Sequence, residues 1–186
     1  LDMPFGGTVT IDDVESGQTS AAFGGTTCHV DFCIQAKGQT FAQALEDWRA
    51  KANGKQMIDM GYHMAVTDLE NGGTLEELAT LPEQGITSYK LFMAYKGALM
   101  VDDETLFRTM EVAAKTGALV MVHAENGDVI DVLVKQALAA TPGVRVDDVS
   151  VGAATVAYDA ATTTPERIVG AVSAAGYPAH AGATDR

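Results

Sequence analysis

The first two thirds of the chain alternate between short apolar segments and amphipathic ones. Four apolar segments predict buried strands whose centres recur about every thirty residues: Thr26–Ile34, Gln56–Val66, Ile86–Ala94 and Ala118–His123. Helical periodicity fills the intervals, at Phe41–Ala52, Leu75–Leu81 and Asp102–Lys115. A strand followed by a helix at this interval predicts right-handed βαβ units and a parallel sheet. Because the strands are almost continuously apolar, we expect both faces of the sheet to be covered.

The pattern changes after residue 140, where two short strands of alternating polarity are predicted. They are Arg145–Val151 and Ala154–Asp159. A helix then begins at Pro165, a residue that favours the first helical turn, and ends at Gly176. A short strand is expected at Pro178–Ala181. This ββαβ pattern does not continue the earlier period, so the architecture changes between residues 118 and 142.

The length of 186 residues fits one ordinary domain or two small ones. Hydrophobic residues make up 47% and charged residues 20%, which is the composition of a globular protein rather than a disordered one. The net charge of −13 argues against nucleic acid and anionic membranes as partners, because phosphate binding favours clustered Lys and Arg. No apolar run approaches the ~20 residues that span a bilayer.

The start of the chain and its cysteine content indicate a compartment. LDMPFGG carries no charged-then-apolar leader, and it lacks an initiator Met, so the expectation is either a processed piece or an engineered chain. With only Cys28 and Cys33, a disulfide framework is excluded. The expected compartment is therefore the reducing cytoplasm.

Polar residues lie at the carboxyl ends of the predicted strands, where parallel α/β folds collect their chemistry. They are Asp31, His63, Lys90 with Tyr95, and His123 with Glu125 and Asn126. Imidazoles, a lysine and carboxylates on one rim predict a metal site with nitrogen and oxygen ligands, or acid–base chemistry. Lys90 is the strongest candidate, since a buried ammonium is costly unless it is neutralised, paired or modified.

Several of these residues also have a purely structural interpretation. His63 alone is typical of a satisfied core or rim residue, and Asp31 of a hydrogen-bond acceptor in the scaffold. Cys28 and Cys33 are an odd number of positions apart, so on a strand they face opposite sides and cannot chelate one ion. The methionines are interpreted as packing.

Residues 1 to about 140 resemble the amino-terminal third of the dihydropyrimidinase and hydantoinase family of cyclic amidohydrolases. The resemblance rests on LDMPFGGT at the start, AAFGGTT at 21–27, GITSYKLFMAYKG at 85–97, DDETLF at 102–107 and GALVMVHAENGD at 117–128. It implies a (β/α)8 barrel with a binuclear metal centre, usually of two zinc ions, and hydrolysis of hydantoin or dihydropyrimidine rings.

The resemblance also implies roles for individual residues. Lys90 matches the metal-bridging lysine that CO2 converts to a carbamate, and His123 matches a histidine ligand of the second metal. Tyr95 matches the tyrosine that hydrogen-bonds the oxyanion formed when a metal-bound hydroxide attacks the cyclic amide. Phe92 and the loop Met3–Phe5 match positions that line the substrate pocket.

The chain departs from the family pattern in its metal ligands. The family's His-x-His pair would stand immediately before the first residue, and its third histidine and general-base aspartate lie in downstream strands that are absent here. Of the expected metal ligands only Lys90 and His123 are present. We therefore expect the chain alone to be inactive. Its open sheet edges would be covered by a second copy, the missing barrel half or the carboxy-terminal strands.

Residues from about 140 to 180 resemble the latter part of a heavy-metal-associated domain, a ferredoxin-like βαββαβ sandwich. The pattern is PGV, an alternating strand, ATVAYD, a helix that begins with Pro, and AGYPA. Ala118–His123 and Val129–Ala140 would supply the first strand and helix, an element that both resemblances share. The loop between them, HAENGD, has no Cys-x-x-Cys, so thiolate coordination of mercury or copper(I) is not predicted.

The predicted fold class is therefore α/β: a partial (β/α)8 barrel of about four βα units followed by a ferredoxin-like ββαβ segment. The expected domains are residues 1–117, a shared element at 118–140 and residues 141–186. The leading functional interpretation is a fragment or chimera of a metal-dependent cyclic amidohydrolase. One alternative is a metal-binding module. It would be either of the heavy-metal-associated type without its Cys-x-x-Cys, or a divalent site on His123, Glu125 and His63. The other alternative is a purely structural or engineered product.

Overall fold

The computed structural model describes residues 1–5, 8–150 and 152–182. The chain forms two compact units. The first comprises Leu1–Met93 and Leu99–Glu125, and the second comprises Ala94–Ala98 and Asn126–Arg186. Among the described residues, no helix is long and apolar enough to cross a bilayer.

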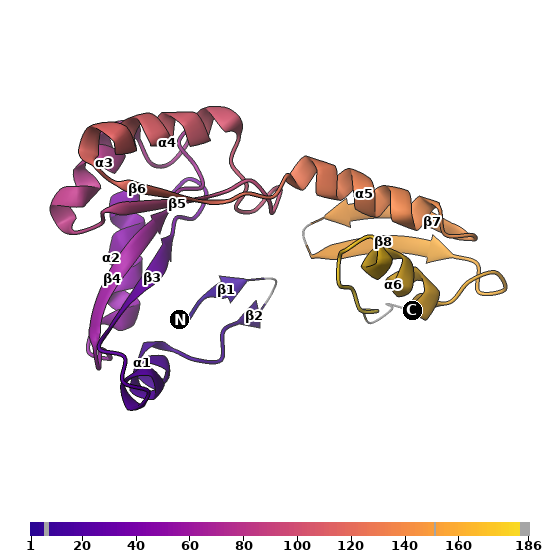
Figure 1. The fold of residues 1–186 in the computed structure, drawn as a ribbon, viewed down its shortest axis with the longest axis horizontal. Helices are drawn as coiled ribbons and strands as arrows, with labels where there is room; N and C mark the ends of the chain where they lie inside the picture. The colour runs from indigo at the N-terminus through magenta and orange to yellow at the C-terminus, as the bar shows by residue number, and fades with distance from the viewer. Residues whose placement is uncertain (6–7, 151, 183–186) are drawn as a thin grey trace. The chain divides into compact units, whose positions relative to one another are not determined.

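A four-stranded parallel sheet forms the centre of the first unit (Figure 1). Its strands, in spatial order, are β3 (Cys28–Ile34), β4 (Asp59–Ala65), β5 (Ser88–Phe92) and β6 (Leu119–His123). Each strand therefore lies beside its neighbour in the sequence, with helices in the connections. The predicted α/β fold with a parallel sheet is confirmed.

Three helices bury their apolar sides against one face of this sheet. They are α2 (Phe41–Ala52), α3 (Leu75–Thr80), which continues into the 3-10 turn η1 (Leu81–Gln84), and α4 (Asp103–Thr116). α2 begins where predicted because Thr40 and Gln43 form a capping box. We call this side of the sheet the closed face; its core residues are Cys33, Tyr62, Met64, Tyr89 and Leu91.

The opposite side of the sheet, the open face, carries the alternate residues of the same strands. We define it by Val30, Phe32, His63, Lys90, Phe92, Met121 and His123. Val30 is 48% exposed, and the others are half-buried. Within the first unit the helices α2, α3 and α4 cover only the closed face, so the expectation that helices cover both faces is not met there.

Three elements before β3 were not predicted. A short antiparallel pair joins β1 (Pro4–Phe5) to β2 (Thr8–Val9), so the expected loop at Met3–Phe5 is partly a strand. The helix α1 (Val14–Phe23) follows. Its Gln18 is fully buried, and the side-chain oxygen accepts hydrogen bonds from the amides of Met57 and Ile58 at 2.6 and 3.0 Å. This contact anchors a helix that has no strong apolar stripe.

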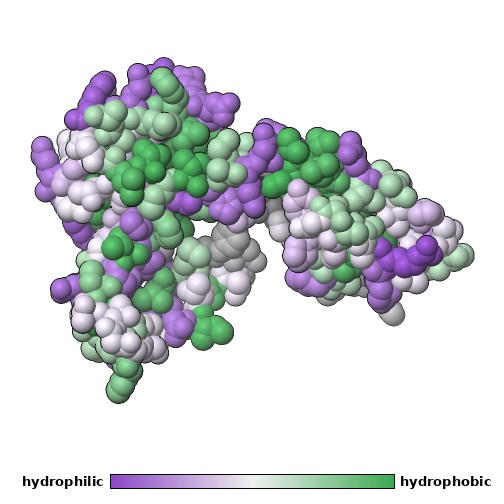
Figure 2. Space-filling model, viewed as in Figure 1, coloured by the Kyte–Doolittle hydropathy of each residue, from purple (hydrophilic) through white to green (hydrophobic). Residues whose placement is uncertain are grey.

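The second unit contains the helix α5 (Gly127–Ala139), the strands β7 (Val144–Ser150) and β8 (Ala153–Tyr158), and the helix α6 (Pro165–Ala174). The two strands pair with each other in an antiparallel sheet. Figure 2 shows apolar surface over α5, where Val129, Val132 and Leu133 are 50%, 51% and 40% exposed.

The ferredoxin-like arrangement is not confirmed. No strand forms at Pro178–Ala181, where Pro178 lacks an amide donor for a ladder. β6 pairs with β5 in the first unit, whereas α5 lies in the second, so the expected shared element is divided. In the described part of the chain β7 and β8 pair only with each other, so the expectation that carboxy-terminal strands cover the parallel sheet's edges is wrong.

Candidate active site

Lys90 lies in the middle of β5, on the open face. Its Cα partners are Ala65 on β4 and Met121 on β6. The side chain is half-buried, and its Nζ lies 4.7 Å from the centre of the Phe92 ring. Burial lowers the pKa of the Lys90 ammonium. Among the described residues no carboxylate pairs with it, so a neutral amine is easier to reach here than on the surface.

His123 ends β6 directly opposite Phe92. The two ring centroids are 5.9 Å apart, with the planes tilted by 32°. The imidazole Nε2 lies 3.3 Å from Glu125 Oε2, an ion pair when the ring is protonated. The structure therefore places Lys90, Phe92 and His123 together on one face of two adjacent strands.

His63 occupies the same face on β4, beside a serine that the sequence analysis did not single out. Its Nδ1 lies 2.5 Å from the hydroxyl oxygen of Ser88, which is 7% exposed. Its ring packs against Phe32, with centroids 5.4 Å apart. Burial lowers the pKa of the His63 imidazole. The sequence could have indicated Ser88, because it lies two residues before Lys90 and such residues share a strand face.

Tyr95 belongs to the short segment Ala94–Ala98, which clusters with the second unit. Its φ of 66° is left-handed, a conformation that costs free energy for a residue with a bulky side chain. Its carbonyl accepts a hydrogen bond from the amide of Ala98 at 3.0 Å, which closes a turn.

The two candidates near the start of the chain lie in the first unit. Met3 packs against the hydrophobic core, and its amide donates to Thr10 Oγ1 at 2.9 Å. The backbone of Phe5 belongs to β1, but its side chain lies outside the described part of the structure.

Two other rim residues have structural roles. Asp31 alternates onto the opposite side of β3 from Phe32, and its carboxylate accepts a hydrogen bond from the Phe32 amide at 2.8 Å. Asn126 caps α5, where its side-chain oxygen accepts from the amide of Val129 at 3.0 Å. Cys33 is fully buried, which raises the pKa of its thiol to about 12 and makes it a poor ligand.

A complete metal centre does not form from these residues. No group of three His, Cys, Asp or Glu side chains is placed to hold an ion within residues 1–5, 8–150 and 152–182. The chemistry of Lys90 and His123 fits two ligands of a divalent site, not a whole one. We therefore derive no metal-dependent step from this chain alone.

The loops that follow β3 and β4 are joined by a buried glutamine. Gln35 is 1% exposed; its side-chain nitrogen donates to the carbonyls of Gln39 and Asp68 at 2.7 and 2.8 Å. Its side-chain oxygen accepts from the amides of Thr67 and Asp68, each at 3.0 Å. All of its hydrogen-bonding capacity is used, so the two loops are held as one rigid edge.

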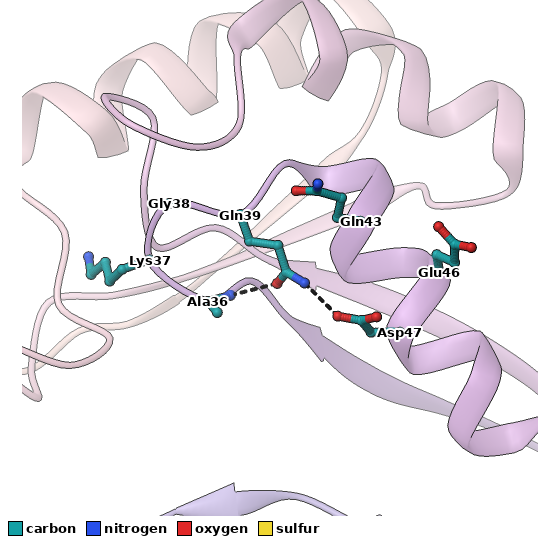
Figure 3. A pocket seen from close by; sticks show the side chains of 7 residues that line it. All are labelled: Ala36, Lys37, Gly38, Gln39, Gln43, Glu46 and Asp47. Carbon is teal, nitrogen blue, oxygen red and sulfur yellow. Dashed lines mark hydrogen bonds between the residues drawn. The ribbon is translucent and has the colours of Figure 1, made fainter.

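A shallow pocket of about 420 Å³ opens beside this edge, at the start of α2 (Figure 3). It is lined by Ala36, Lys37, Gly38, Gln39, Gln43, Glu46 and Asp47. Gln39 spans it, accepting from the Ala36 amide at 3.0 Å and donating to the Asp47 carboxylate at 2.6 Å. None of the predicted site residues lines this pocket, so it is separate from the candidate site.

Comparison with known proteins identifies relatives for most of the chain. A D-hydantoinase of Geobacillus stearothermophilus is 57% identical over 139 residues, which is 74% of this chain and 29% of that protein. A dihydropyrimidinase of Arabidopsis thaliana is 45% identical over 130 residues, 70% of this chain and 24% of that protein. The chain thus spans less than a third of the length of these relatives. No family model matches.

Solved structures give the same result. A D-hydantoinase structure aligns with a TM-score of 0.70 and 46% identity over 76% of this chain and 31% of that one. A dihydropyrimidinase from Brevibacillus agri NCHU1002 aligns with a TM-score of 0.70 over 94% of this chain and 37% of that one. About three quarters of the chain is therefore homologous to D-hydantoinases and dihydropyrimidinases, while a heavy-metal-associated domain is not confirmed.

Proposed function

We propose that this chain is part of a metal-dependent hydrolase of cyclic amides, of the hydantoinase and dihydropyrimidinase type, to which it contributes some of the active site. The observation that carries the proposal is the placement of Lys90, Phe92 and His123 on one open face, within a segment homologous to D-hydantoinases. The substrates are hydantoins or dihydropyrimidines.

Lys90 is the residue whose surroundings support this role most clearly. A half-buried amine without a carboxylate partner loses its proton more readily than a surface lysine. The neutral nitrogen can then form a bond to the carbon of CO2 while a proton leaves to solvent, giving a carbamate. This reaction replaces a costly half-buried cation with an anionic carboxylate. Zinc binds oxygen as well as nitrogen ligands, so the carbamate oxygens can coordinate it.

His123 and Tyr95 are proposed to complete the contribution of this chain. The His123 imidazole supplies a nitrogen ligand, and Glu125 at 3.3 Å orients the ring. The Tyr95 hydroxyl is proposed as the donor to the developing oxyanion. The left-handed backbone of Tyr95 supports this proposal, because strained conformations of this kind are typical of functional sites. Phe92, Met3 and Phe5 are proposed to contact the substrate.

Assembly with further polypeptide is proposed as a condition for activity. A divalent metal lowers the pKa of bound water and polarises a carbonyl, but it needs more ligands than the two identified here. In the described residues the outer edges of β3 and β6 have no strand partner, and such edges favour pairing with another chain. A second copy or the missing barrel half would cover them.

Fragment complementation tests this proposal. The chain is refolded with zinc and bicarbonate, alone or with the part of the Geobacillus stearothermophilus D-hydantoinase that lies outside the matched residues. We expect no ring opening by the chain alone and measurable ring opening by the mixture, lost in Lys90→Met and His123→Ala. The matched fragment of the relative itself serves as the positive control. Activity with that control but none with this chain would contradict the proposal.

A further inference from the structure

The junction between β4 and β5 has the shortest backbone ladder in the parallel sheet. β3 and β4 are aligned over seven Cα pairs and β5 and β6 over five, whereas β4 and β5 share only two. Those two are Met64 with Tyr89 and Ala65 with Lys90. The ladder continues with the amide of Val66, which donates to the Lys90 carbonyl at 2.9 Å. Backbone pairing therefore joins the carboxyl end of β4 to the middle of β5, where Lys90 lies.

A side-chain contact begins where this ladder stops. His63 and Ser88 each lie one residue before the first aligned pair, and His63 Nδ1 is 2.5 Å from Ser88 Oγ. Ser88 is 7% exposed, so its hydroxyl needs a partner inside the protein, and the imidazole provides it. The contact joins the two strands at the position where the backbone does not.

A second contact fixes the imidazole itself. The His63 ring packs against Phe32 on β3, its Cα partner, with centroids 5.4 Å apart and planes tilted by 41°. Because β3 and β4 are paired along their whole length, the backbone positions of Phe32 and His63 are fixed relative to each other. Ser88, two residues before Lys90, is thus attached through His63 to the best-paired part of the sheet.

We propose that His63 and Ser88 are positioning residues that hold β5 against β4 beneath Lys90 and so set the direction of the Lys90 side chain. The His63–Ser88 hydrogen bond acts in place of the absent backbone pairing. What Lys90 does once it is positioned rests on the proposed function, but the positioning itself does not.

Competitive acetylation tests the positioning directly. Limiting acetic anhydride is added to the intact chain, and peptide masses give the rate at Lys90 relative to the exposed Lys115 and Lys135. Loss of one hydrogen bond in Ser88→Ala or His63→Leu is expected to free Lys90 from Phe92 and raise its relative rate about three- to tenfold. His63→Asn, which keeps a hydrogen-bonding group near the Nδ1 position, is expected to restore the wild-type rate.

A matched variant separates positioning from general loss of stability. Thr109→Ala removes a fully buried hydroxyl of α4 that donates to the Thr105 carbonyl at 2.8 Å, away from the open face. It is expected to lower stability without changing the relative rate at Lys90. If Ser88→Ala does not fold, Ser88→Cys gives the same comparison with a weaker hydrogen bond.

Three outcomes would overturn the positioning role. They are a wild-type rate in both Ser88→Ala and His63→Leu, an equal increase in Thr109→Ala, and failure of His63→Asn to restore the rate. Zinc titration in bicarbonate is run in parallel, and Ser88→Ala is expected to weaken binding about tenfold. If wild type and Lys90→Met bind zinc equally, the proposed function fails, while the acetylation rates still decide the positioning role.

Discussion

The two faces of the parallel sheet differ in what their residues do. On the closed face, Met64, Tyr89 and Leu91 have no exposed surface and pack under the helices. On the open face, His63, Lys90 and Phe92 of the same strands are half-buried, as is His123 on β6, so this face carries an amine and two imidazoles. Because side chains alternate along a strand, each strand packs one set of residues into the core and presents polar side chains on its other face.

This difference explains how a lysine fits in an apolar strand. Lys90 stands between Tyr89 and Leu91, both fully buried, yet its own side chain points to the other face. In this part of β5 the stabilising burial of apolar surface is therefore provided by Tyr89 and Leu91, and the fold does not require it of Lys90. The same holds for His63, between the buried Tyr62 and Met64.

The largest expected effect is on stability, from a truncation on the closed face. Leu91→Ala leaves a cavity among helices and strands and is expected to cost about 3 kcal/mol of unfolding free energy. Met121→Ala, at a half-buried position of the open face, is expected to cost about 1 kcal/mol or less. Urea unfolding followed by the fluorescence of Trp48, the only tryptophan, measures both in the first unit. Equal losses would contradict the distinction between the faces.

The two cysteines report the same difference through their reactivity. Cys33 is fully buried on the closed side, and burial raises the pKa of its thiol to about 12, whereas Cys28 is exposed. With an aromatic disulfide reagent at pH 8, Cys28 is expected to react about a hundredfold or more faster than Cys33. Full unfolding in urea should make the two rates similar. Comparable rates in the folded protein would show that the closed face is not closed.

The smallest expected effect is a pH dependence from the open face. Burial lowers the pKa of folded His63 below its ordinary value of 6.5, so the unfolded state binds a proton more readily. Stability from this residue is therefore fully present above pH 6.5 and is lost as pH falls through the lowered value. Urea unfolding between about pH 7.5 and pH 5 should show a smaller loss in His63→Gln than in wild type. His180→Gln, at an exposed position, should leave the wild-type profile unchanged.

Much of the parallel sheet is predictable because local signals agree with the tertiary structure. The Thr40 capping box places the start of α2, and Gly117, with a left-handed φ of 75°, ends α4 one residue beyond the predicted limit. The placement of Lys90 and His123 on one face follows from alternation along adjacent strands once the parallel pairing is assumed.

The contacts that complete the site depend on distant parts of the chain and are not predictable in this way. The His63–Ser88 contact depends on the register between β4 and β5, which no local pattern specifies. Gln35 pairs with residues 32 and 33 positions away. α1 was missed because a buried glutamine, rather than an apolar stripe, anchors it.

Lys90 and His123 are proposed to belong to one metal site on the open face. Calorimetry with zinc in bicarbonate buffer tests it on wild type, Lys90→Met, His123→Ala and the exposed control His180→Ala. We predict heat of binding in wild type and His180→Ala, and affinity at least about tenfold weaker in each of the other two variants. No heat in wild type, or equal affinity in all four proteins, would contradict the claim.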